Sequence, residues 1–464
     1  MKIVYLAAGT ESTLGGETRV AMELSVAMSK YAEVAIIFTG KENRIYHEDG
    51  LLKVSLEGGE YTGGELGVFT PATVQFYFDF LDSFKPDVIH SHSAWLAPFI
   101  GQVWALNHNI PYFYTTHVLP SRISEFFEVS GDSFVYKMMD EAIFKKYFLG
   151  YLNNCTSVIA LNEIANSQVR KYGYSGNMDI IPNGRFLKGL ISLKLADIKS
   201  KKINLIFVGS VTIRKNQEYL LRVMKYLPKN FTLTLVGRFL FDEYAKKFKR
   251  LASKYKNVIV TGGVDPSEIP AYLERSHIFV SASTAEVQAL SVIEALASGR
   301  PVVGLSNETI DELIDESNGM WLDKDTTPKD FAKAVVAISK LSSAEYGKLS
   351  RSARSRVSTL DWDNIANRTL GLYEKYLLSK ESRVGSSKRI REMILKLPYF
   401  PGQTYLLSKY DENIGNIEKI DNVGKMAKLP KGTLVFAGVT IGLAALVFGG
   451  MKLSKFIKNS VKKK

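Results

Sequence analysis

Short apolar runs alternate with helical patterns along the first 380 residues of the chain. Runs such as 2–8 and 34–39 have the length of a buried strand, whereas 362–379 repeats its apolar residues at helical spacing. The predicted strands are 2–8, 34–39, 86–90, 111–117, 157–162, 179–184, 203–209, 231–237, 257–263, 277–283 and 301–305. Alternating strands and helices in two successive halves predict an α/β protein with two doubly wound domains.

The two halves meet at residues 185–202, a stretch that contains lysines and no clear strand. We therefore predict an N-terminal domain over 1–185 and a C-terminal domain over 186–361, followed by a closing helix at 362–380. The remaining segments are a basic connector, an apolar run and a Lys-rich tail, at 381–430, 432–451 and 452–464.

The basic charge of the chain lies mostly at its C-terminal end. The chain carries a net charge of +13, of which residues 381–464 supply +10 from 16 Lys or Arg and 6 Asp or Glu. Residues 1–380 are close to neutral, and they contain no nucleic-acid reader motif, so we expect no nucleic-acid partner. The hydrophobic content of 46% excludes disorder as the main state, and a single cysteine, Cys155, excludes an intrachain disulfide.

The apolar run 432–451 has 20 residues and no charge. As a helix it would be roughly 30 Å long, which matches one hydrocarbon thickness. Lysines flank it on both sides, at positions 425, 428, 431, 452, 455, 458 and 462–464. We expect a membrane-inserted helix whose lysines contact an anionic membrane surface, with a spanning and a re-entrant path both open. The segment 119–153 reads either as an interfacial amphipathic helix or as an ordinary core helix.

Two common nucleotide-binding motifs are absent from the sequence. The loop after the first strand offers Gly9, Gly15 and Gly16, which do not have the G-x-G-x-x-G spacing of a dinucleotide-binding loop. The sequence also lacks the GxxxxGK[ST] loop of a P-loop NTPase.

A better candidate site lies in the second half. Glu286 and Glu294 are eight residues apart, and a helix starting just after Glu286 would turn its N-terminal amides toward a bound diphosphate. Glu294 would lie about two turns in, on the same face, where it could accept hydrogen bonds from ribose hydroxyls. Arg214 and Lys215 follow the strand 203–209 and could neutralise the diphosphate.

These residues resemble the family-four retaining glycosyltransferases, over roughly residues 1–380. The quoted parts are Gly15-Gly16, PDVIHSHS (86–93), His117, IPNG (181–184), Lys215 and the Glu286–Glu294 pair with its ALASGRPVV continuation. The segment Glu286-Val-Gln288-Ala289-Leu290 is similar to the E-T-Q-G-L variant of glucosyltransferases that act on diacylglycerol. The chain departs from the family at Ser210, where arginine is frequent, and at Ala289, where glycine is common.

The resemblance implies the GT-B fold, in which two Rossmann-like domains face each other. It implies that Glu286 holds hydroxyls of the donor sugar, Glu294 the ribose and Lys215 the diphosphate, with His117 beside the transferred sugar. Gly15 and Gly16 would let the backbone approach a ligand closely. Gln288, Ala289 and Leu290 would belong to the donor site, and Arg214 could replace the arginine missing at Ser210.

The expected reaction is retaining transfer of a hexose from a nucleotide sugar, with UDP-glucose as donor and diacylglycerol as the preferred lipid acceptor. No cofactor and no metal are expected, although His92 and His117 can be read as metal ligands or as cleft histidines. Phosphatidylinositol, a polyprenyl carrier or a glycan are alternative acceptors, and a degenerate membrane scaffold is the non-enzyme alternative. The domains would face the cytoplasm, where nucleotide sugars are found, and the oligomeric state is open.

Overall fold

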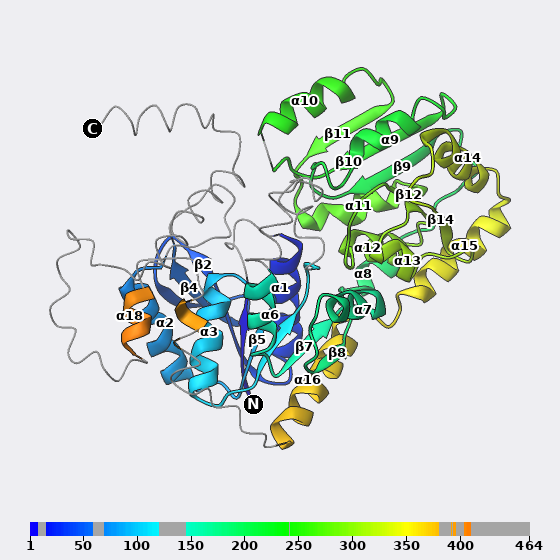
Figure 1. The fold of residues 1–464 in the computed structure, drawn as a ribbon. Helices are drawn as coiled ribbons and strands as arrows, with labels where there is room; N and C mark the ends of the chain where they lie inside the picture. Colours follow the sequence, from blue (N-terminus) through cyan, green and yellow to red (C-terminus); the bar gives the residue numbers. More distant parts are fainter. Residues whose placement is uncertain are drawn as a thin grey trace, which may run out of the picture.

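The computed structural model describes residues 1–7, 15–58, 69–119, 145–240, 242–379, 391, 393–395 and 403–409. Within this part, each half of the sequence forms its own largely parallel β-sheet, and helices pack around both (Figure 1). The prediction of two successive α/β units is therefore confirmed. The domain limits at 185 and 361 stay predictions.

The N-terminal sheet has eight strands in the order β3-β4-β2-β1-β5-β6-β7-β8. Their bounds are β1 Lys2–Leu6, β2 Glu33–Gly40, β3 Arg44–Glu48, β4 Leu51–Glu57, β5 Val88–Ser91, β6 Tyr112–Thr115, β7 Ser157–Ala160 and β8 Met178–Ile180. Strands β3 and β4 form an antiparallel hairpin, whereas the other neighbours are parallel. Asp49 and Gly50 connect the hairpin at φ of 52° and 74°, as a two-residue turn of this kind requires.

The C-terminal sheet has six strands, all parallel, in the order β11-β10-β9-β12-β13-β14. Their bounds are β9 Ile203–Val208, β10 Phe231–Val236, β11 Val258–Gly262, β12 Ile278–Ser281, β13 Val302–Leu305 and β14 Gly319–Leu322. Five of these match predicted strands, and β14 was not predicted.

The helices cover both faces of the two sheets. On β1, Val4 and Leu6 belong to one apolar core, and Ile3 and Tyr5 belong to another on the opposite face. Burial on both faces explains why the strands read as unbroken apolar runs. The longer helices are α1 Gly16–Met28, α2 Pro71–Phe84, α3 Leu96–Asn107, α6 Lys145–Leu152, α7 Glu163–Lys171, α10 Asp242–Ala252, α12 Leu290–Ala297, α14 Pro328–Ser339, α15 Ser343–Arg356 and α16 Trp362–Leu378.

The chain passes between the two units twice, and the two passages are hydrogen-bonded to each other. The Arg185 N–H donates to the carbonyl of Leu360 at 2.8 Å, and the Trp362 N–H donates to the carbonyl of Arg185 at 3.2 Å. The second passage leads into α16, which lies against α1 of the N-terminal unit (Figure 1). The predicted closing helix is therefore present, and it completes the N-terminal half.

Part of the expected connector 381–430 is packed on the N-terminal unit. Helix α18 (Gln403–Ser408) lies against α2 (Figure 1). Met393, Ile394 and Leu406 are buried in the core beneath it. The Gln403 side-chain amide donates to the Ile394 carbonyl at 2.8 Å, which ties the two short pieces together.

The predicted membrane segments are tested only in part. The apolar run 432–451 and its lysines lie outside the described residues. Among the residues that the structure does describe, no helix has the length and the apolar character that a membrane crossing needs. Of the segment 119–153, helix α6 is described, and its Phe148, Tyr151 and Leu152 are buried in the N-terminal core. For that part the core interpretation holds.

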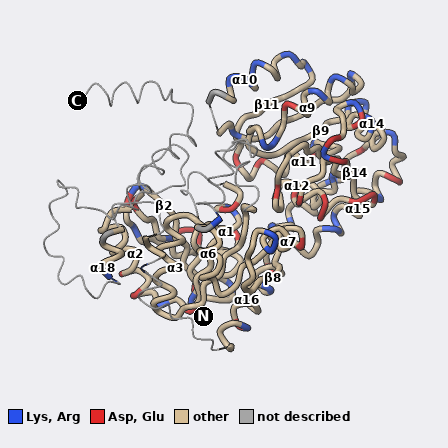
Figure 2. The backbone as a smooth tube through the Cα atoms, in the orientation of Figure 1, with Lys and Arg blue, Asp and Glu red and all other residues tan. Residues whose placement is uncertain are grey.

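Charged residues of both signs are mixed over the described surface, with basic residues gathered along α10 (Figure 2). The last turn of α10 carries Lys249 and Arg250. The mixed distribution agrees with the small net charge that the sequence gives for residues 1–380.

Candidate active site

Loops after two neighbouring strands bring the charged residues of the candidate site together. Strands β9 and β12 are adjacent and parallel, so their carboxyl ends lie at the same edge of the sheet. Arg214 and Lys215 follow β9, and Glu286 follows β12. The Thr284 N–H donates to the Arg214 carbonyl at 2.9 Å and holds the two loops side by side.

A close backbone contact fixes the loop that carries the two cations. A Cβ atom at Gly237 would lie 2.0 Å from the carbonyl oxygen of Gly209, so a side chain cannot be accommodated there. The following residue, Ser210, has its carbonyl bonded by the side-chain amide of Gln217 at 2.8 Å. These two contacts fix the start of the loop, at Gly209 and Ser210, before the chain reaches Arg214.

Lys215 and Arg214 both contact the carboxylate of Glu286. Lys215 Nζ forms an ion pair with Glu286 Oε1, and Arg214 Nη1 lies 3.3 Å from Glu286 Oε2. Arg214 Nη1 also donates to the Ala285 carbonyl at 2.6 Å. The structure brings these three residues together, as the sequence predicts. Both cations contact the same carboxylate.

Burial and charge act in opposite directions on this cluster. Burial raises the pKa of Glu286, but the charges of Lys215 and Arg214 and the hydrogen bond from Lys215 together hold that pKa below its usual value. Burial also lowers the pKa of Lys215, against the opposing effect of Glu286. Glu286 is therefore an ionised carboxylate at neutral pH.

Glu294 lies in a second charged cluster, which joins the two units. Arg185 Nε donates to Glu294 Oε1 at 2.7 Å, and Arg185 Nη1 pairs with Glu23 Oε1 on α1. Arg19 Nε donates to Glu23 Oε1 at 3.0 Å, and Trp362 Nε1 donates to Glu23 Oε2 at 2.7 Å. The residue expected to bind ribose thus has a cationic partner in this ligand-free chain.

The sequence did not reveal this second cluster. Arg185 directly follows the segment IPNG, and its partners Glu294 and Glu23 are 109 and 162 residues away. One signal was available within a single helix, because Arg19 and Glu23 have the i,i+4 spacing of a helical ion pair.

The helix predicted to start just after Glu286 begins later. Helix α12 starts at Leu290, with Ala289 as its N-cap, so Glu286 lies in the preceding loop. Glu294 is the fifth residue of the helix, and the prediction that the pair shares one helical face two turns apart was wrong. The cause is Ala289, whose extended backbone delays the first helical turn and whose N–H donates to Thr309 Oγ1 at 2.8 Å.

Gln288 contacts residues of both units. Its Oε1 accepts from the Asn183 N–H at 2.6 Å, and its Nε2 donates to Glu312 Oε1 at 2.9 Å. Asn183 Nδ2 in turn donates to the Gln288 carbonyl at 3.2 Å. The donor-binding roles of Gln288, Ala289 and Leu290 stay predictions.

Gly15 and Gly16 stand where α1 begins. Gly15 is the N-cap residue, with no side chain to cap the helix, and Gly16 is its first residue. A Cβ at Gly16 would meet no described heavy atom within 4 Å. The close approach of a ligand to Gly15 and Gly16 stays a prediction, and the preceding loop 8–14 lies outside the described residues.

Three histidines lie together at the carboxyl ends of β5 and β6. His90 and His92 stack with ring centroids 4.5 Å apart, and His92 Nδ1 lies 2.9 Å from His117 Nε2. His90 bonds Tyr373 Oη at 2.5 Å and Thr115 Oγ1 at 2.8 Å. Burial lowers the pKa of His90 and of His117 to about 3, so both are neutral. In the described part of the chain, no group of three or more His, Cys, Asp or Glu side chains could hold a metal ion.

The buried histidines should make the stability of the protein fall in acid. Between about pH 6.5 and 3, unfolded histidines take up protons that buried His90 does not, so lowering the pH favours unfolding. For His90 this amounts to about 2 kcal/mol between pH 6.5 and pH 5. Urea unfolding of the wild type and of His90→Asn at both pH values measures it. The difference between the two proteins should shrink at pH 5, and a constant difference would contradict the assignment.

Both units match known protein families. Residues 14–185 match the family described as Glycosyltransferase Family 4, and residues 202–340 match Glycosyl transferases group 1. The chain is 26% identical over 250 residues to an alpha-monoglucosyldiacylglycerol synthase from Streptococcus pneumoniae. That match covers 50% of this chain and spans only about half, 55%, of the relative's length.

Solved structures share the arrangement of the two sheets. A sucrose-phosphate synthase from Thermosynechococcus elongatus superposes with a TM-score of 0.67 at 20% identity, covering 82% of this chain and 100% of that one. Anabaena HepE, in complex with UDP-glucose, gives a TM-score of 0.64 at 15% identity, over 81% and 100%. These likenesses establish the GT-B-like fold of two facing parallel sheets. The two family matches, in consecutive order along the sequence, show that the chain carries glycosyltransferase domains of the family-four type.

Proposed function

We propose that the protein transfers glucose from UDP-glucose to a lipid acceptor of the diacylglycerol class, with retention of configuration, at the cytoplasmic side of a membrane. The observation that carries the transfer is the convergence of Lys215 and Arg214 on Glu286. The relative named alpha-monoglucosyldiacylglycerol synthase supports the acceptor class, and the UDP-glucose complex of HepE supports the donor.

The cations would act on the leaving group. Transfer breaks the bond between the sugar C1 and the diphosphate oxygen, so negative charge grows on the diphosphate. Lys215 and Arg214, held by the β9 loop, can stabilise that charge without rearranging at the moment of reaction. A new bond forms from C1 to the acceptor hydroxyl oxygen, and the hydroxyl proton passes to the leaving phosphate.

The donor would replace the internal ion pair of the ligand-free site. Glu286 is the partner of both cations in the absence of a ligand, and its carboxylate fills the place of an anion. When a diphosphate takes over Lys215 and Arg214, Glu286 becomes free to accept hydrogen bonds from the sugar hydroxyls. The same carboxylate thus offsets one of the two positive charges, and it would orient the donor sugar once the diphosphate is bound.

The membrane contact rests on the sequence of the C-terminal end. The uncharged run 432–451 and its flanking lysines suit an inserted helix at an anionic surface. Helix α18, which precedes this run, packs on α2, so the N-terminal unit would be the one held near the lipid. That unit also carries His117, which faces the acceptor side in this proposal.

Vesicles that contain diacylglycerol and anionic lipid, incubated with radiolabelled UDP-glucose and the full chain, test the proposal. We expect a labelled glucosyl lipid with the wild type, and far less product from Lys215→Met in the same time. A panel of UDP- and GDP-sugars, with phosphatidylinositol, a polyprenyl phosphate, a glycan and a hexose phosphate as acceptors, separates the alternatives. If only the hexose phosphate gives a product, the acceptor is a sugar phosphate and not a lipid, and the reaction resembles that of the sucrose-phosphate synthases. If the folded chain transfers no sugar to any of these acceptors, the proposal that it is a glycosyltransferase is wrong.

A further inference from the structure

His92 lies between the other two histidines of the cluster and is almost fully buried, with 1% of its surface exposed. Its Nδ1 is 2.9 Å from His117 Nε2, and the two rings are nearly parallel, at 22°. His90 does not compete for His117, because its ring nitrogens bond Tyr373 and Thr115. One proton must therefore lie between His92 and His117, on one ring or the other.

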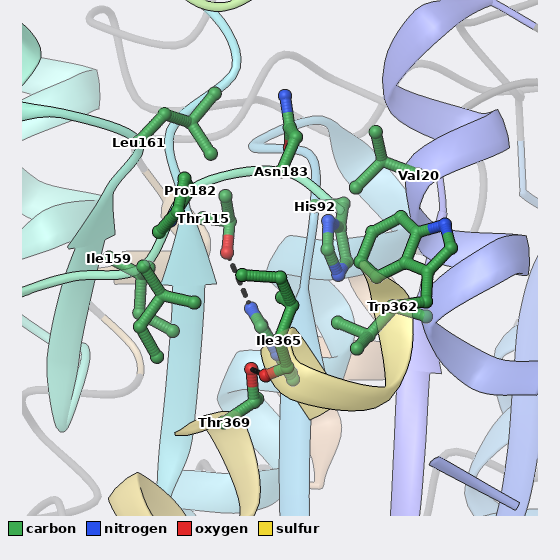
Figure 3. Close-up of a pocket in the computed structure, with 13 residues that line it drawn as sticks. Val20, His92, Thr115, Ile159, Leu161, Pro182, Asn183, Trp362, Ile365 and Thr369 are labelled. Carbon is green, nitrogen blue, oxygen red and sulfur yellow. Dashed lines mark hydrogen bonds between the residues drawn. The ribbon is translucent and has the colours of Figure 1, made fainter. Parts of the chain in front are cut away.

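Two buried polar atoms without hydrogen-bond partners in the described chain belong to residues that line the same small cavity. They are His92 Nε2 and Asn183 Oδ1, and both residues line a cavity of about 20 Å³ (Figure 3). Asn183 Nδ2 donates to the Gln288 carbonyl, which leaves Oδ1 as an acceptor without a partner among the described residues. The cavity has room for about one water molecule.

The unpaired acceptor decides which tautomer His92 adopts. A proton on His92 Nε2 places a donor opposite the Asn183 acceptor, directly or through one water in the cavity. The other tautomer would put two acceptors on the same buried space. With Nε2 protonated, His92 Nδ1 must accept, so His117 donates through Nε2–H and keeps a lone pair on Nδ1.

We infer that His92 is a positioning residue, which holds His117 in the Nε2–H tautomer with Nδ1 available to accept a hydrogen bond from a substrate hydroxyl. This inference rests on the proposed function. His117 Nδ1 makes no hydrogen bond to any residue that the structure describes. Gln288 bonds Asn183, and His92 bonds His117. One water between Asn183 and His92 would complete a polar path from the loop of Glu286 in one unit to His117 in the other.

Kinetics of two His92 variants test the role in turnover. We expect His92→Phe to lower kcat by about 10- to 100-fold while KM for the nucleotide sugar changes little, because His117 loses its orienting acceptor. His92→Asn should recover part of kcat, since an amide oxygen can accept from His117 Nε2–H. The matched control is His108→Phe, a half-exposed histidine of the same unit, which should keep wild-type kcat. A folded His92→Phe with unchanged kcat would overturn the role.

Nitrogen-15 NMR of histidine-labelled, ligand-free protein at pH 7 tests the tautomer without any turnover. The chain has six histidines, so single variants can assign the signals. In the wild type we expect His92 and His117 both to be neutral, with the proton on Nε2. In His92→Phe we expect His117 to populate a mixture of the Nε2–H and Nδ1–H tautomers. A wild-type His117 protonated on Nδ1 would overturn the inference. If the wild type transfers no sugar, the proposed function fails, while this spectrum still decides the tautomer.

Discussion

Replacing Lys215 by methionine should lower kcat/KM for the nucleotide sugar by about 10²- to 10³-fold. Lys215 is the cation closest to Glu286, and methionine keeps much of the volume of the lysine stem while removing its charge. Because the charge on the diphosphate grows as the bond to the sugar breaks, the loss should fall on kcat as well as on KM. Initial rates over a range of donor concentrations separate the two effects.

The control for Lys215→Met is Lys247→Met, at an exposed lysine of the same unit. Lys247 has 65% of its side chain exposed and contacts Glu218 at 3.2 Å, so its loss should leave kcat/KM unchanged. Circular dichroism and the thermal unfolding midpoint show whether the Lys215 variant is folded. A well-folded Lys215→Met enzyme with wild-type kcat/KM would show that another group neutralises the leaving diphosphate.

Replacing Arg185 by alanine should reduce the free energy of unfolding by about 3–5 kcal/mol. Arg185 is 7% exposed and pairs with Glu23 on α1 and Glu294 on α12. Its removal leaves two poorly solvated carboxylates close to each other, with Arg19 as their remaining cation. Denaturant unfolding followed by tryptophan fluorescence measures the loss, because Trp362 donates to Glu23 in the same cluster.

A surface ion pair near the same elements supplies the comparison for Arg185. Lys30 and Asp363 form a pair between the end of α1 and the start of α16, but both side chains are about half exposed. Lys30→Ala should leave the unfolding midpoint nearly unchanged, because solvent and salt screen such pairs. Equal midpoints for wild type and Arg185→Ala would mean that the cluster does not hold the two units together.

The sequence was most informative about the sheets. All eleven predicted strands are present, and strands such as β1 and β12, which are buried almost completely, were recognisable because nearly all their residues are apolar. Strand β14 (Gly319–Leu322) was not predicted, because the run is short and its Trp321 is 46% exposed. Strands β3 and β4 were not among the predicted strands, although Asp49-Gly50 is a usable signal for the hairpin turn between them.

The candidate site was predictable where topology brings residues together and not where side chains reach across the units. Arg214, Lys215 and Glu286 each follow a strand, so the shared edge of the sheet implies their proximity. The contact of Arg185 with Glu294 depends on how two units face each other, which residue spacing does not encode. The start of α12 depended on the backbone of Ala289, which gives no helix-capping signal in the sequence.

The packing of α16 and α18 on the N-terminal unit means that this unit is assembled from separated stretches of the sequence. Its core includes Tyr373 from α16 as well as Ile394 and Leu406 from the segment that follows. A chimaera that exchanges N-terminal units between relatives at residue 185 would therefore join α16 and α18 of one protein to a first half from another. A workable exchange must transplant the first half together with α16 and residues 391–409, so the natural module of recombination is the C-terminal sheet, inserted between two parts of its neighbour.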